Sequence, residues 1–129
     1  MPLKLTLGKG EKLIVNGAVI KNDGDGASLV FENQAHILRQ KDIVTNDTAR
    51  TPAARVYLSL QCAYLFPNRR DAHLVDWETL LNDFTEAAPS ACDLVDEMRR
   101  EVERGELYHG LKLCRKLIDH EAEILSHVE

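Results

Sequence analysis

The sequence predicts an α+β protein, in which a small five-stranded antiparallel β unit precedes a segment of about four helices. Two observations predict this class. Apolar residues recur with a period of two and are interrupted by tight-turn sequences up to residue 44, and they recur with a helical period from residue 48 onward. We therefore expect a β unit at residues 1–47 and a helical segment at residues 48–129. With 129 residues, the chain is long enough for one ordinary domain or for two small ones that share a core.

Five short segments of the first part carry the strand pattern: residues 3–7, 12–15, 18–21, 28–32 and 35–39. In the first of them, three leucines alternate with Lys4 and Thr6, which is typical of a half-buried strand. The pair Asn16-Gly17 lies between two β-branched runs and predicts a type I′ hairpin turn, because both residues tolerate positive φ. A sheet of this size buries too little apolar area to be stable alone, so it requires a helical layer or a second copy of itself.

The first helix is predicted by its start and by its composition. Thr51 followed by Pro52 is typical of an N-cap and a first helical residue. Apolar residues between positions 56 and 65 cover nearly every face, which predicts a helix that is buried on all sides, and Pro67 ends it.

Three further helices follow. Apolar residues at i, i+3, i+4 and i+7 over residues 77–84 predict the second. A Pro-Ser pair at 89–90 begins the third, with Asp93 at the capping-box position and Gly105 at the C-terminal cap. The last helix spans about residues 106–127. Its predicted inner face consists of Leu107, Leu111, Cys114, Leu117, Ile118 and Leu125.

The sequence lacks the motifs of the common catalytic and metal sites. No pair among the five histidines has the spacing of metal ligands on a helix, and no serine lies in a nucleophile elbow. Cys62, Cys92 and Cys114 lie among apolar neighbours without a CxxC pair, which predicts buried, reduced thiols. We therefore expect no enzymatic activity, no catalytic residues, no metal and no cofactor.

The chain also lacks a membrane signal. No run approaches the roughly 18 apolar residues of a membrane span. The first residues lack the basic and apolar regions of a signal peptide. We expect a cytoplasmic protein with no membrane partner.

Charge is distributed unevenly along the chain, whose net charge is −5. Residues 1–47 are balanced, residues 48–70 carry four arginines and no acid, and residues 71–129 carry six bases and fifteen acids. A polyanion would be repelled by the last segment, so it could dock only near residues 36–70. Exposed acidic helix faces are a simpler explanation of the same distribution.

The polar face of the first strand and the bases after the fifth are candidate RNA-binding groups. If the fifth strand returns beside the first, they form one basic edge: Lys4, Thr6, Arg39, Lys41, Arg50 and Arg55. Guanidinium groups bind phosphates, and an open strand edge offers backbone groups to unpaired bases. The alternative is ordinary surface charge, with a salt bridge from Arg55 to the acidic helices. With aromatic residues at only 5%, a stacking platform of the kind found in common RNA-binding folds is not expected.

Four stretches in the first half form a distinctive set: MPLKLTL at the start, GEKLIVNGAVI at 10–20, the motif NQA…ILR.KDI at 33–43, and TPAARVY at 51–57. Together they resemble the FlbT family of flagellin-synthesis regulators. The resemblance implies binding to the 5′ untranslated region of flagellin mRNA, with control of its translation and stability. Members usually repress, some act positively, and the usual companion is a small helical protein called FlaF.

The strand region also resembles the RNA-binding translational regulator CsrA, through residues 5–17 and 33–43. This resemblance implies a CsrA-like five-stranded unit that dimerises by exchanging strands. Its RNA edge is built from the first strand and the end of the fifth. The matching positions are Lys4, Leu5, Thr6 and Arg39, with Lys41 as a neighbour.

The sequence thus predicts a homodimeric post-transcriptional regulator that binds a flagellin mRNA leader and no DNA. The alternative is a protein-interaction adaptor of the flagellar system. Its acidic helical half would bind a FlaF-like partner or flagellin, which the nine net negative charges of residues 71–129 favour.

Overall fold

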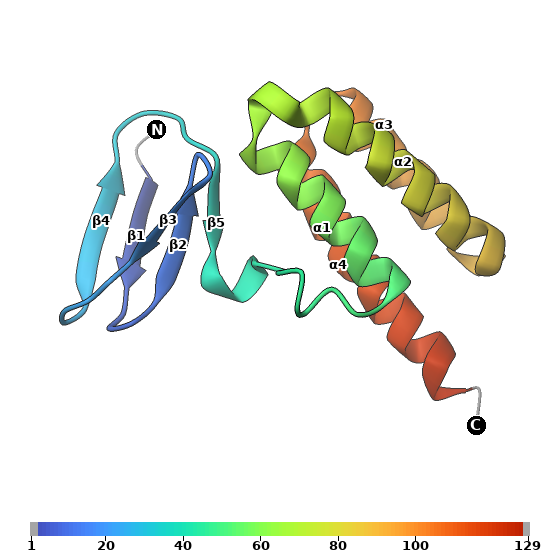
Figure 1. Cartoon of the computed structure of the whole chain (residues 1–129), viewed down its shortest axis with the longest axis horizontal. Coiled ribbons are helices and arrows are strands. Elements are labelled where there is room, and N and C mark those ends of the chain that lie inside the picture. The colour runs from blue at the N-terminus through green and yellow to red at the C-terminus, as the bar shows by residue number, and fades with distance from the viewer. Residues whose placement is uncertain (1–2, 128–129) are drawn as a thin grey trace. The chain divides into compact units, whose positions relative to one another are not determined.

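The computed structural model describes residues 3–127, and its internal contacts divide the chain into two compact units. A strand unit extends to Ile43, and a helical unit begins at Val44 (Figure 1). The helical unit starts there because the Gln61 amide holds the backbone of Val44. The Gln61 Oε1 atom accepts the Val44 N–H at 2.8 Å, and Nε2 donates to the Val44 carbonyl at 2.8 Å.

The strand unit contains five antiparallel strands: β1 (Leu3–Leu7), β2 (Lys12–Val15), β3 (Ala18–Lys21), β4 (Ala27–Phe31) and β5 (Ile37–Arg39). They form two sheets, one with the order β1-β4 and one with the order β3-β2-β5. Together with the four helices that follow, they confirm the predicted α+β class. The hairpin between β2 and β3 has φ of 51° at Asn16 and 87° at Gly17, as the Asn-Gly pair predicts.

The fifth strand does not return beside the first, so the condition for one continuous basic strand edge is not met. Instead β5 pairs with β2, with Leu13 opposite Arg39. Two hydrogen bonds with His36 fix this arrangement: the Asn16 N–H donates to the His36 carbonyl at 2.8 Å, and the Asn16 Oδ1 accepts the His36 N–H at 2.9 Å. The turn residue that sets the hairpin therefore also sets the partner of β5.

The strand unit has a small core and a large exposed apolar area. Between Leu3 and Ile43, the buried apolar side chains are Leu7, Leu13, Ile14 and Leu38. Over the same range four large apolar side chains are exposed: Leu3, Val19, Ile20 and Val30. Leu3 is 45% exposed, so the three leucines of β1 do not form one buried face. A two-stranded sheet covers its apolar face incompletely.

The helical unit consists of α1 (Pro52–Leu65), α2 (Arg70–Ala87), α3 (Cys92–Glu103) and α4 (Leu107–Ser126). Short 3₁₀ turns at Pro67–Arg69 and Pro89–Ala91 connect α1 to α2 and α2 to α3, and a third, η1 (Gln40–Asp42), lies at the end of the strand unit. Helix α1 packs against both α2 and α4 (Figure 1), and nine of its side chains are buried, which agrees with the prediction from its composition. In the described residues, no helix combines the length and apolar character needed to cross a bilayer.

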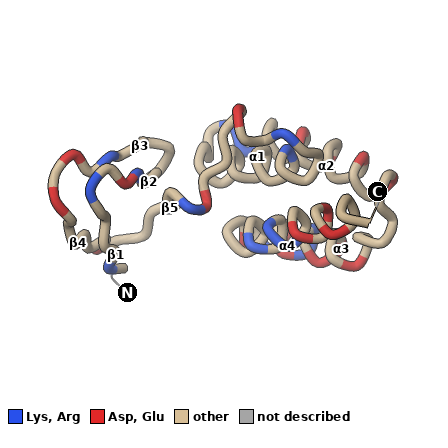
Figure 2. Tube along the Cα trace, turned by 90° about the horizontal axis from the view of Figure 1, so that it is seen from below, with Lys and Arg blue, Asp and Glu red and all other residues tan. Residues whose placement is uncertain are grey.

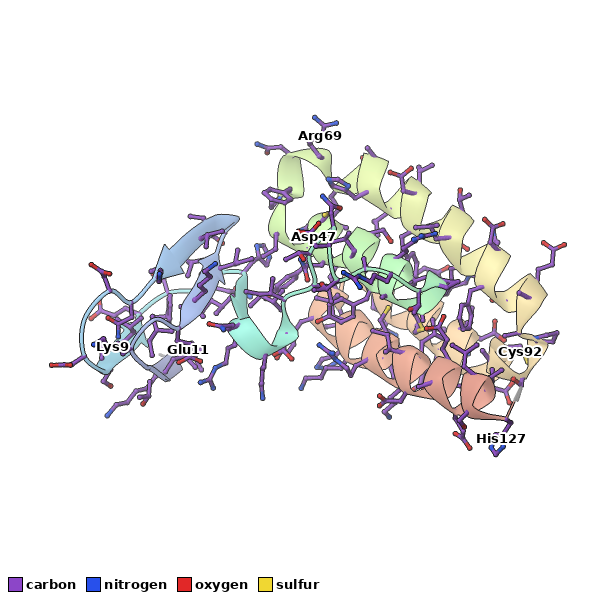
Figure 3. The ribbon with its side chains drawn as sticks, turned by 60° about the horizontal axis from the view of Figure 1, so that its bottom comes forward. Lys9, Glu11, Asp47, Arg69, Cys92 and His127 are labelled. Carbon is purple, nitrogen blue, oxygen red and sulfur yellow. The ribbon has the colours of Figure 1, made fainter. Side chains whose placement is uncertain are left out.

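Three predictions about side chains in the helical unit are wrong. Leu125 is 57% exposed and lines an open apolar cavity near the end of α4. Asp93 forms no capping box: the residue at the N-cap of α3 is Ala91, and the hydroxyl of Ser90 instead lies 2.9 Å from Nε2 of His120. Cys92 is exposed at the start of α3 (Figure 3).

The three cysteines are free thiols in different environments. Cys114 is buried, and burial raises the pKa of its thiol to about 12. Cys62 is half-buried, and burial raises the pKa of its thiol as well. Since the thiolate is the reactive form, Cys114 is chemically inert in the folded chain.

The N-terminus of α1 has an acceptor for each N–H group of its first turn. Pro52 has no N–H, and the Ala54 N–H donates to the hydroxyl of Thr51 at 3.2 Å. The Ala53 N–H donates to Oε2 of Glu121 on α4 at 3.0 Å, across 68 positions of sequence. Glu121 is only 8% exposed. A buried carboxylate at a helix N-terminus gains both from the hydrogen bond and from the helix dipole.

We expect Glu121→Ala to lower the free energy of unfolding by about 2 kcal/mol, because the buried Ala53 N–H loses its acceptor. Glu121→Gln keeps an acceptor without the charge and should cost about half as much. The exposed Glu123 on the same helix provides the control, and Glu123→Ala should change stability by less than about 0.5 kcal/mol. Urea unfolding followed by circular dichroism measures all three, and equal effects at the two positions would contradict the role given to Glu121.

Candidate nucleic-acid interface

The first strand presents three of the predicted RNA-binding residues. Lys4 and Thr6 are exposed, and Leu5 between them is half-buried. Since β1 pairs only with β4, its other edge has no strand partner among the described residues. An edge of this kind has backbone N–H and C=O groups that can bind a ligand.

Arg39 approaches β1 although the two strands are not paired. It ends β5, and its Nη2 atom lies 3.5 Å from the carbonyl oxygen of Thr6, at the upper limit of hydrogen-bonding distance. This contact bridges the two sheets of the strand unit. Arg39 and Thr6 therefore lie close together, as predicted. The prediction assumed that β5 pairs with β1, whereas a side-chain contact brings them together here.

Lys41 lies beside a base that the sequence analysis did not select. Lys41 and Lys9 line one open hollow of about 360 Å³, together with Gly10, Glu11 and Gln40. The Gln40 side chain fixes this arrangement, because its Oε1 accepts the backbone N–H of Lys12 at 2.6 Å. Figure 3 shows Lys9 and Glu11 on the turn between β1 and β2.

Lys12 and Lys21 add two further bases. They are exposed and directly opposite each other on β2 and β3. Like charges at such positions repel, so an anion between them would relieve the repulsion. The hairpin register could have revealed this pair, because a two-residue turn at Asn16-Gly17 necessarily places position 12 opposite position 21.

Charge differs between the two units. The strand unit carries six bases and five acids, and three of those acids lie in the loops on either side of β4 (Figure 2). The helical unit carries ten bases and sixteen acids. Because long-range repulsion of a polyanion follows net charge, the strand unit is the more favourable of the two for nucleic acid.

Arg50 and Arg55 belong to the helical unit, whereas the other five predicted RNA-binding residues belong to the strand unit. They lie at the start of α1, where Arg50 Nε donates to the carbonyl of Asp47 at 2.9 Å. Within residues 3–127 neither arginine forms an ion pair, so the predicted salt bridge from Arg55 to the acidic helices is not formed there.

Arg69 and Arg70, the other two arginines of residues 48–70, lie past the C-terminal end of α1. This helix has 14 residues and is hence roughly 20 Å long. Arg69 points away from the helices into solvent (Figure 3). Arg70 is half-buried, and its Nε donates to the Ala63 carbonyl at 2.9 Å. The four arginines of residues 48–70 therefore do not form one patch.

A metal-binding cluster is also not formed by the described part of the chain, where no three His, Cys, Asp or Glu side chains gather. The candidate interface thus consists of bases and a strand edge, which suit the binding of an anionic polymer.

The chain matches the profile of a known protein family. The profile of the family described as "Flagellar protein FlbT" matches residues 3–125, which include nearly all of both units. The chain belongs to the FlbT family. This confirms the resemblance that the sequence motifs indicated, and it extends the resemblance from the first half to the helical unit.

Named relatives in the FlbT family are similar over nearly their whole length. A probable flagellum biosynthesis repressor protein FlbT of Caulobacter sp. strain K31 is 38% identical over 99% of both chains. The flagellum biosynthesis repressor protein FlbT of Caulobacter vibrioides is 38% identical, over 99% of this chain and 92% of the relative. A relative from Bradyrhizobium diazoefficiens is 35% identical over all of this chain and 88% of its own. No solved structure matches the chain.

Proposed function

We propose that this protein is a cytoplasmic post-transcriptional regulator of flagellin synthesis that binds the 5′ untranslated region of flagellin mRNA. It controls translation and stability of that mRNA by binding alone, without catalysis or a cofactor. Membership in the FlbT family and the relatives' names as flagellum biosynthesis repressors support this proposal. Those names favour repression, for which blocking of ribosome access is the simplest mechanism.

The observation that carries the RNA proposal is the grouping of bases in the strand unit. Arg39 lies against β1, and Lys41 shares a hollow with Lys9 beside Lys12. These groups bind phosphates, while the open edge of β1 at residues 4–6 offers backbone groups to unpaired bases. Recognition of a single-stranded loop by its base edges suits a surface that is poor in aromatic side chains.

Association with a second copy of the chain is part of the proposal. Within residues 3–127, each of the two sheets has two edges without a strand partner, β1 and β4 in one and β3 and β5 in the other. Apolar side chains are exposed on three of these strands, with Val19 at 65% and Val30 at 56%. A second strand unit, with or without the strand exchange that the CsrA-like pattern implies, would cover both the edges and these side chains.

The RNA proposal is tested by the double variant Arg39→Ala with Lys41→Ala. In a mobility-shift titration with a flagellin leader RNA, it should weaken binding by at least about tenfold. Loss of two phosphate contacts should also reduce the slope of log K against log salt by about 1.4. The measurement is the dissociation constant at two or more salt concentrations.

The matched control is Arg100→Ala with Lys116→Ala, which removes two exposed bases from the acidic helical unit. It should leave both affinity and salt slope unchanged. Equal losses from the two double variants would show that net charge alone controls binding, and wild-type binding that does not depend on salt would contradict an electrostatic interface.

The proposed dimer is tested by Val30→Glu, which places a charge on the exposed apolar side of β4. Sedimentation equilibrium should show at least about a tenfold increase in the dimer dissociation constant, because a buried unpaired charge opposes association. Val75→Glu, at a side chain 66% exposed on α2, is the control and should leave the constant unchanged. A wild-type chain that remains monomeric at all concentrations would contradict the dimer.

A further inference from the structure

An apolar cavity of about 460 Å³ lies at one end of the helical unit. The start of α1, the C-terminal half of α2 and the end of α4 lie together there (Figure 1). Apolar side chains form most of its surface: Pro52, Leu80, Phe84, Ile124 and Leu125. This volume is within the range of ligand-binding pockets. Leu125, which the sequence pattern placed in the core, is 57% exposed beside the cavity.

Charged groups of opposite sign line this cavity from different segments. Arg50 and Arg55 lie on the side of α1, and Asp83 lies on the side of α2. Neither arginine pairs with an acid within residues 3–127, and Glu121 already accepts the Ala53 N–H. Two guanidinium groups without an acidic partner among the described residues therefore line the cavity of a unit that carries more acids than bases.

We propose that this cavity binds an amphipathic helical segment of a partner protein. Apolar side chains of the segment, spaced at i, i+3 or i+4, and i+7, enter the cavity. An acidic residue on one flank of the segment faces Arg50 and Arg55, and a basic residue on the other flank faces Asp83. This surface lies in the helical unit, so the proposal goes beyond RNA binding by the strand unit and does not rest on it.

Other ligands fit the cavity less well. A fatty acid would place its carboxylate near the arginines, but its chain would remain in contact with water in a cavity that leaves Leu125 more than half exposed. RNA phosphates would meet the arginines but also an apolar floor and a unit with sixteen acids. A helix with an apolar face and charges of both signs can contact the apolar lining, the two arginines and Asp83 at once.

The experiment selects 16-residue peptides from a random display library against the full chain, and measures binding of the enriched peptides by fluorescence polarisation. Enriched peptides should combine the helical apolar stripe with an acidic flank. Arg55→Glu should weaken their binding at least about tenfold through charge reversal, as should Leu125→Asp through a charge on the apolar surface. Replacing the peptide's acids with lysine should restore binding to the Arg55→Glu chain.

Matched controls keep this test specific. Arg100→Glu and Val75→Asp change an exposed arginine and an exposed apolar residue that do not line the cavity, and both should leave peptide binding unchanged. Circular dichroism verifies folding, and the charge-exchange rescue separates recognition from misfolding. A double arginine variant, Arg50→Ala with Arg55→Ala, is also titrated with leader RNA, so that peptide binding and RNA binding at these arginines are measured separately.

Three results would overturn the proposal. In the first, no enriched peptide responds to the cavity variants or to the charge exchange. In the second, palmitate displaces the peptides at micromolar concentration and binds the Arg55→Glu chain less well, which would assign the cavity to an acyl ligand. In the third, the double arginine variant loses RNA binding, which would assign these arginines to nucleic acid. None of these results changes the outcome expected for Arg39 and Lys41.

Discussion

The helical unit depends on one buried contact, in which the carboxylate of Glu121 accepts the Ala53 N–H. A carboxylate removed from water is costly unless it is hydrogen-bonded, and an unpaired N–H at a buried helix start is costly as well. Pairing the two removes both costs and fixes α4 against the first turn of the central helix α1. The same contact determines where Ile124 and Leu125 lie, because they follow Glu121 within one helical turn. The apolar cavity is thus a consequence of how α1 is capped.

The strand unit, in contrast, buries little apolar surface area. Among the described residues of this unit, four large apolar side chains are buried and four are exposed. Its order depends instead on polar contacts between backbone and side chain: Asn16 with His36, Gln40 with Lys12, and Asn22 with the carbonyl of Leu7 at 2.8 Å. These contacts leave strand edges and bases open. A small unit whose surface is not used by its own fold is available for a second copy and for an anionic polymer.

The sequence predicts those features that a few neighbouring residues determine. Asn16-Gly17 fixes a hairpin and Thr51-Pro52 fixes a helix start, because φ restrictions and capping bonds act within a turn. Features set by distant partners are not predicted. The placement of β5 beside β2, the capping of α1 by Glu121 and the exposure of Leu125 and Cys92 all depend on contacts between segments. For the candidate interface, Arg39 and Lys41 follow from the charge pattern, whereas Lys9 and Lys12 require the positions of η1 and β2.

We propose that the strand unit binds RNA and that the helical unit has another task. The most direct test is NMR mapping of the isotope-labelled full chain, titrated with a flagellin leader RNA. Amide shifts should change at residues 4–6, 9–12 and 39–41, around the bases and the open edge of β1. The amides of α2 and α4 that line the apolar cavity should not move. Changes confined to the helical unit, or no changes at all under low salt, would contradict this assignment.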